Sequence, residues 1–118
     1  MSVRLTWPGG EHDFALPIGQ LRALQDRCDA GPAHIITRLA TGSWRVDDVI
    51  QTIRLGLEGG GLAKDEARKL TELHVEQAPL ARSVMLAQMV LMDAVYGPED
   101  DRVGELEAGA ETASPAEG

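Results

Sequence analysis

The sequence is poor in the residues that mark several common classes of protein. It holds one cysteine, Cys28, so no disulfide can form within the chain, which is typical of a reducing compartment. Aromatic residues make up only 3%, and the core must therefore be built mainly from aliphatic side chains and methionine. The most apolar stretch, residues 84–96, contains Gln88 and Asp93 and is shorter than the roughly 20 residues of a membrane span. The N-terminus lacks the apolar core of a signal peptide, and we expect a cytoplasmic protein.

Basic residues are also scarce, and the charge is unevenly distributed. Eleven bases against 19 acids give a formal net charge of −8. The last 21 residues hold seven acids and one base, a net charge of −6, which leaves −2 for the first 97 residues. Such a chain offers no basic stripe to a phosphate backbone or to an anionic lipid surface. We therefore expect neither nucleic acid nor a membrane as a partner.

The nucleophiles and metal-binding side chains do not occur at the spacings that their chemistry requires. None of His12, His34 and His74 has a zinc-binding spacing to another histidine or to the cysteine. The candidate nucleophiles Ser43, Ser83 and Cys28 have no base at a recognisable motif spacing. The sequence thus predicts a protein that is not an enzyme, with no catalytic residue, no metal site and no cofactor.

Two further segments resemble functional motifs but have structural interpretations. The glycine-rich stretch 56–64 lacks the Lys-Ser/Thr pair of a phosphate-binding loop, so its glycines at 59–61 favour a helix stop and a connector. Asp47 and Asp48 are adjacent acids that could act as a metal or acid–base pair. At the start of a helix they are more typical of capping, because the helix dipole stabilises anions there.

Periodicity predicts an α+β fold with an N-terminal β-hairpin packed on about five short helices. Residues 2–7 and 11–16 alternate apolar and polar side chains, which places Val3, Leu5 and Trp7 on one face. Pro8-Gly9-Gly10 between the two segments is a strong turn signal. Helical spacing follows, and Gly31 can adopt a positive φ at the first break. Residues 1–97 form the expected domain, and residues 98–118 are expected to be a disordered acidic C-terminal tail. The expected helices lie near 17–28, 32–41, 46–58, 65–75 and 79–97. Helical spacing gives the third helix an apolar face of Val46, Val49, Ile50, Ile53 and Leu57, and the fourth helix the apolar residues Ala67, Leu70 and Leu73.

The fifth helix carries apolar residues on two opposite faces. A helix that is apolar on both sides lies centrally in a bundle or contacts a partner. We favour core packing for its methionines, because the helix needs cover on most sides. The alternative is a flexible apolar surface that binds partner helices. The first face holds Leu80, Val84, Ala87, Leu91 and Val95. The second face holds the candidate partner-binding residues Met85, Met89, Met92 and Tyr96.

The order of these features resembles a known family over roughly residues 3–96. The combination of a Leu-x-x-Leu helix, an Arg-Leu-x-x-Gly segment and a Gly-Leu-x-Gly-Gly-Gly segment carries the resemblance, and these segments are 21–24, 38–42 and 56–61. The chain is similar to the small tail protein of gene transfer agents and related long-tailed phages. That family is labelled both a tail assembly chaperone and a tail tube protein.

The resemblance implies a non-enzymatic role in tail morphogenesis. It implies a tail assembly chaperone that binds the tail tape measure protein and other tail proteins in the cytoplasm of the host cell. The tube label favours an alternative, a structural subunit associated with the tube and retained in the virion. A small-molecule-binding or enzymatic domain is a further alternative. The oligomeric state, including a homo-oligomer, stays open.

Overall fold

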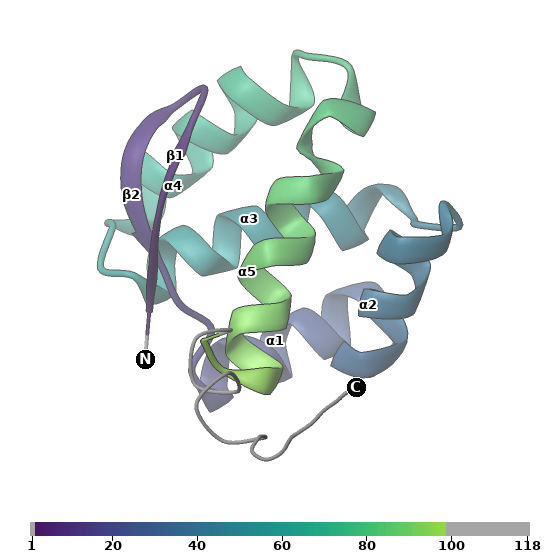
Figure 1. The fold of residues 1–118 in the computed structure, drawn as a ribbon. Coiled ribbons are helices and arrows are strands. Elements are labelled where there is room, and N and C mark those ends of the chain that lie inside the picture. The colour runs from purple at the N-terminus through teal and green to yellow at the C-terminus, as the bar shows by residue number, and fades with distance from the viewer. Residues whose placement is uncertain (1, 99–118) are drawn as a thin grey trace, which may run out of the picture.

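The computed structural model describes residues 2–98, which form a hairpin followed by helices (Figure 1). Strands β1 (Val3–Trp7) and β2 (Gly10–Phe14) pair antiparallel in one two-stranded sheet. The expected α+β fold is therefore confirmed. The expected disordered acidic tail, residues 98–118, lies outside the described residues except for Pro98. The helices are α1 (Ile18–Cys28), α2 (Pro32–Thr41), α3 (Val46–Gly59), α4 (Lys64–Thr71) and α5 (Val84–Tyr96), with a π-helical turn η1 (Glu72–Glu76) after α4 and a 3-10 turn η2 (Leu80–Ser83) before α5.

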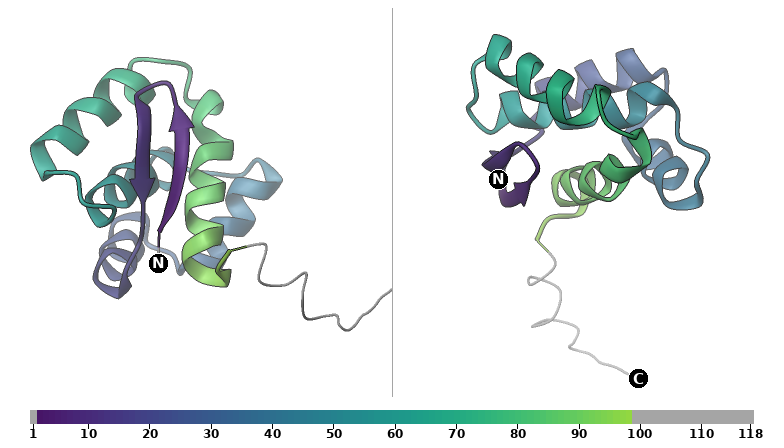
Figure 2. Two further views of the ribbon diagram at one scale, coloured as in Figure 1. Left: turned by 60° about the vertical axis from the view of Figure 1, so that its left-hand side comes forward. Right: turned by 90° about the horizontal axis from the view of Figure 1, so that it is seen from above.

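The elements form two layers. The hairpin, α5 and α2 lie in one layer, and α4, α3 and α1 lie in the other (Figure 2). Helix α3 is central because it packs against α1 and α4 within its layer and against α5 and β2 across the layers. Its expected apolar face is buried at Val49, Ile53 and Leu57 but not at Val46, which is exposed at the start of the helix.

The hairpin turns its apolar face toward the helices, as its alternation predicts. Trp7 and Phe14 are buried and meet edge to face, with ring centroids 5.9 Å apart. The indole Nε1–H of Trp7 donates to Nδ1 of His12 at 2.9 Å, and the ring of His74 contacts the same indole. On the opposite face of the hairpin, the Arg4 guanidinium donates to Asp13 at 3.0 Å. The Trp7 indole thus links β1 to β2 and anchors the hairpin to η1, the segment after α4.

The chain leaves the hairpin in close contact with α3. The Ala15 N–H donates to the Gly56 carbonyl at 3.0 Å. A Cβ built on Gly56 would lie 2.9 Å from Cγ1 of Val90 on α5 and 3.3 Å from Cδ2 of Phe14. The glycine therefore lets the hairpin, α3 and α5 approach one another at a single point.

Two local expectations are wrong. Gly31 has a φ of −69°, and Asp29 adopts the left-handed conformation that ends α1, with a φ of 52°. Aspartate tolerates this conformation better than most residues because its short polar side chain can hydrogen-bond locally. Leu73, expected on the buried face of the fourth helix, is 56% exposed, and Val75 is buried instead. The π-helical turn η1 widens the helix at this point, so the 3.6-residue period no longer holds.

Candidate functional site: an apolar groove along helix α5

Helix α5 turns one face into the core. This face packs against α2 and α3, and its buried residues are Leu86, Ala87, Val90 and Leu91. The face expected from the sequence is rotated relative to this one: Val84 is only half-buried, and Val95 is exposed. The helix presents its opposite face to solvent.

That opposite face carries the four candidate partner-binding residues. Their spacing along α5 places them on one side of the helix. The interpretation that the methionines pack in the core is wrong, because all three are exposed and the opposite face of α5 packs against α2 and α3. The exposed fractions are 71% for Met85, 45% for Met89, 37% for Met92 and 60% for Tyr96.

Strand β1 and helix α5 lie side by side (Figure 2), and a groove of about 370 Å³ runs between them. Val3 and Leu5 line it from β1, opposite the four residues named above. Gln88, Asp93 and Gly97 complete the lining. The sequence placed Val3 and Leu5 on the apolar face of the hairpin, but no sequence signal indicates that this strand lies beside the fifth helix.

The groove carries a negative charge toward one end. Asp93 is the one charged residue in its lining, and none of the ion pairs among residues 2–98 includes it. Asp93 follows Met92 in the C-terminal half of α5, so its charge lies at the part of the groove that this half of the helix lines. The segment with a net charge of −6 begins at Pro98, directly after the last lining residue, Gly97.

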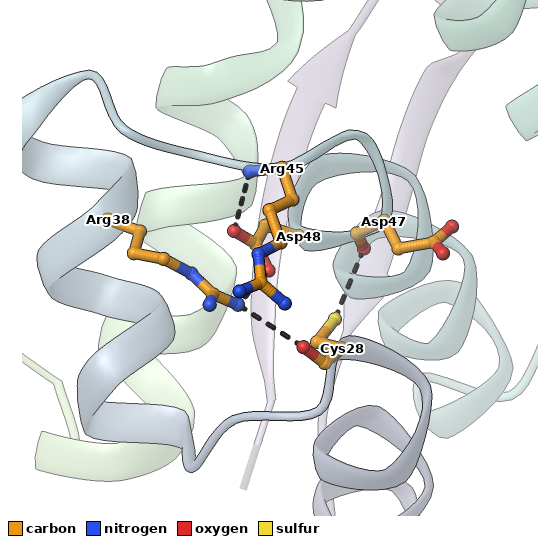
Figure 3. Close-up of polar contacts among 5 residues, drawn as sticks. All are labelled: Cys28, Arg38, Arg45, Asp47 and Asp48. Atoms are coloured by element: carbon orange, nitrogen blue, oxygen red, sulfur yellow. Dashed lines mark hydrogen bonds and ion pairs between the residues drawn. The ribbon is translucent and has the colours of Figure 1, made fainter.

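A second polar cluster joins α1, α2 and α3 (Figure 3). The Asp48 carboxylate is completely buried and accepts hydrogen bonds from the Arg45 N–H at 2.7 Å and from Nη2 of Arg38 at 2.6 Å. The same Nη2 donates to the Cys28 carbonyl at 3.4 Å, and the Cys28 thiol donates to the Asp47 carbonyl at 3.4 Å. Capping of α3 by Asp48 is thereby confirmed, whereas the Asp47 carboxylate points away from the cluster (Figure 3).

The cluster makes Cys28 unreactive, which gives a testable prediction. Burial first, and then the nearby Asp48 carboxylate, raise the pKa of the Cys28 thiol to about 12. An ordinary cysteine has a pKa near 8.5, so at pH 8 the thiolate population of Cys28 should be about 10³-fold smaller. We expect iodoacetamide to label the native chain at least that much more slowly than the chain in urea, as measured by mass spectrometry. Similar rates in both states would contradict the burial of this thiol.

The lining of the groove is apolar apart from Gln88 and Asp93. Within residues 2–98, no three His, Cys, Asp or Glu side chains are grouped closely enough to hold a metal ion. His12 and His74 lie against Trp7, and His34 is exposed on α2. None of the helices in this part of the chain combines the length and the apolar character that crossing a membrane requires.

Comparison with known proteins identifies the family. A family model described as phage tail tube protein, GTA-gp10, matches residues 1–97. Searches of curated proteins and of solved structures gave no match. The matched region spans the hairpin and all the helices described above. The chain therefore belongs to the GTA-gp10 phage tail tube protein family of gene transfer agent and phage tails.

Proposed function

We propose that this chain is a tail assembly chaperone that binds the tail tape measure protein in the α5 groove. The family supports a role together with other tail proteins. The observation that carries the proposal is the exposure of Met85, Met89, Met92 and Tyr96 along one groove. The binding step takes place in the cytoplasm of the host cell, before the tube has polymerised.

The chemistry of the groove suits a long helical partner with exposed apolar faces. Methionine is unbranched and polarizable, so it adapts to apolar side chains of different shapes. Complete burial of one methionine side chain is worth roughly 1.5–3 kcal/mol. Three methionines that are already partly exposed therefore supply a sizeable binding energy without any rearrangement of the core.

Co-expression with a tape measure fragment tests this function. The fragment is expected to stay largely soluble with the wild-type chain and to precipitate when the chain carries Met85→Ser, Met89→Ser and Met92→Ser together. The reason is that the triple variant loses the apolar wall that α5 contributes to the groove. The measurement is the soluble fraction of the fragment after centrifugation.

A matched triple variant separates the groove from general loss of apolar surface. Ile18, Val46 and Leu73 are 62%, 57% and 56% exposed and do not line the groove. Their joint replacement by serine should leave the fragment soluble. Equal loss of solubility with both triple variants would refute the groove as the binding site. No effect of the wild-type chain on the fragment would refute the chaperone role.

The family description favours a second candidate, a structural subunit of the tail tube. A subunit that closes into a ring commonly uses a larger sheet, and the described residues form a sheet of two strands. The two roles differ in where the chain ends up. A chaperone is absent from purified particles, whereas a tube subunit is present in many copies, and quantitative mass spectrometry of particles distinguishes them.

A further inference from the structure

The groove has a charge as well as an apolar surface, and the charge restricts what can bind. We infer that the α5 groove selects an amphipathic α-helix whose apolar ridge is flanked by lysine or arginine. This inference rests on the proposed function and specifies the chemistry of the segment that is bound.

The spacing of the apolar residues favours a helix as the occupant. Met85, Met89, Met92 and Tyr96 recur at intervals of four, three and four residues, which forms a ridge over about 16 Å of α5. Ridges of this kind interdigitate with the ridges of a second helix at three- and four-residue spacing. Val3 and Leu5 of β1 supply the other wall, so a helix of about three turns would contact both sides of the groove.

Asp93 determines the sign of the preferred charge. On α5 it lies one helical turn after Met89, at the border of the apolar ridge, where a flanking side chain of a docked helix would lie. No base lines the groove, and the exposed Arg82 precedes the lining residues. A lysine or arginine would pair with Asp93, whereas an acidic residue would be repelled.

The same charge disfavours two other occupants. The acidic segment after Gly97 could fold back, but its large apolar residues are only Val103 and Leu106, and its seven acids would meet Asp93. A second copy docked through α5 would bring a second Asp93 carboxylate and a second chain of net charge −8 to the groove. A basic amphipathic helix is the occupant that relieves this concentration of negative charge.

Two synthetic peptides of about 18 residues test the inference. Both carry leucines at the same helical spacing, and one has lysines beside the leucine ridge where the other has glutamates. In fluorescence anisotropy titrations with the full chain at low salt, the lysine peptide should bind at least about tenfold more tightly. Circular dichroism should show that the bound peptide is helical. Equal affinity for the two peptides would overturn the inference.

A charge reversal in the groove, with a matched control, locates the effect. Asp93→Lys should reduce the preference for the lysine peptide by about tenfold or more, because it reverses the charge at the groove. Asp26→Lys makes the same change in net charge on the exposed face of α1, away from the groove, and should leave the preference within about twofold. Equal effects of both variants would show that only net charge matters and would overturn the inference.

The remaining outcomes identify the other occupants and separate this inference from the proposed function. Tighter binding of both peptides to a Val103→Ser/Leu106→Ser chain would show that the acidic segment occupies the groove and would overturn the inference. A dimer of the chain that is seen in analytical ultracentrifugation and dissociates in the Met89→Ser variant would show that a second copy occupies the groove, and it would also overturn the inference. Charge-selective peptide binding without solubilisation of the tape measure fragment would refute the chaperone role and support the helix preference. Solubilisation without charge selectivity would refute the preference alone.

Discussion

Replacement of Gly59 by alanine is expected to lower the free energy of unfolding by about 3 kcal/mol, the upper part of the range for overpacked sites. A Cβ at this position would collide with the carbonyl oxygen of Ala15 and lie 2.9 Å from Cδ of Pro17. The colliding oxygen belongs to the backbone between the hairpin and α1, so no side-chain rotation relieves the contact. For a domain with a total stability of about 5–15 kcal/mol, this is a large loss. Urea unfolding, followed by the fluorescence of the buried Trp7, measures it.

Gly19→Ala provides the matched control for this prediction. Gly19 lies in the first turn of α1, is exposed, and has no neighbouring atom within 4 Å of an added Cβ. Alanine is favoured over glycine within a helix by about 0.5–1 kcal/mol, so this variant should be slightly more stable than wild type. Similar destabilisation by both substitutions would mean that the close approach at Gly59 does not limit the packing of the hairpin.

The glycines at 59–61 illustrate what the sequence can and cannot predict. The run correctly indicates where α3 ends, because glycine terminates helices. It does not indicate that Gly59 and Gly60 lie against the backbone at Ala15 and Asp13. That contact depends on the packing of the hairpin on α3, which brings together segments more than 40 residues apart in the chain. Local periodicity therefore predicted the elements, and the long-range packing gave the glycines a second role.

For the candidate site too, the sequence predicted the local pattern of side chains but not the long-range packing. Helical spacing placed the three methionines and Tyr96 on one face, and the structure keeps them there. The sequence favoured core packing for that face, and this is wrong because its exposure depends on the position of β1, which local spacing does not give. Val3 and Leu5 were missed as lining residues for the same reason. A π-helical turn, for which the sequence gave no signal, moved Leu73 out of the expected core.

Substitution of Asp48 by alanine is expected to destabilise the fold by about 3–5 kcal/mol, the cost of breaking a buried ion pair. Asp48 is fully buried, and the side chain of Arg38 is only 9% exposed. Nε of Arg38 has no hydrogen-bond partner in the described part of the chain, so the guanidinium depends on Asp48 for its charge compensation. The variant also loses the acceptor for the Arg45 N–H at the start of α3. Thermal unfolding of the full chain measures the effect.

Two further variants separate the charge from the cap. Asp48→Asn retains an oxygen that can accept from the Arg45 N–H but leaves Arg38 without a counter-ion, so it should recover only the capping part, about 1 kcal/mol. The double variant Arg38→Met/Asp48→Ala has no unpaired buried guanidinium, because methionine fills the space of the arginine side chain without a charge. The double variant should therefore be more stable than Asp48→Ala alone, although it carries one more substitution. Arg38→Met alone completes the cycle. If its loss of stability and that of Asp48→Ala add up to the loss in the double variant, Asp48 contributes through packing and capping, and the buried pair itself has no net effect on stability.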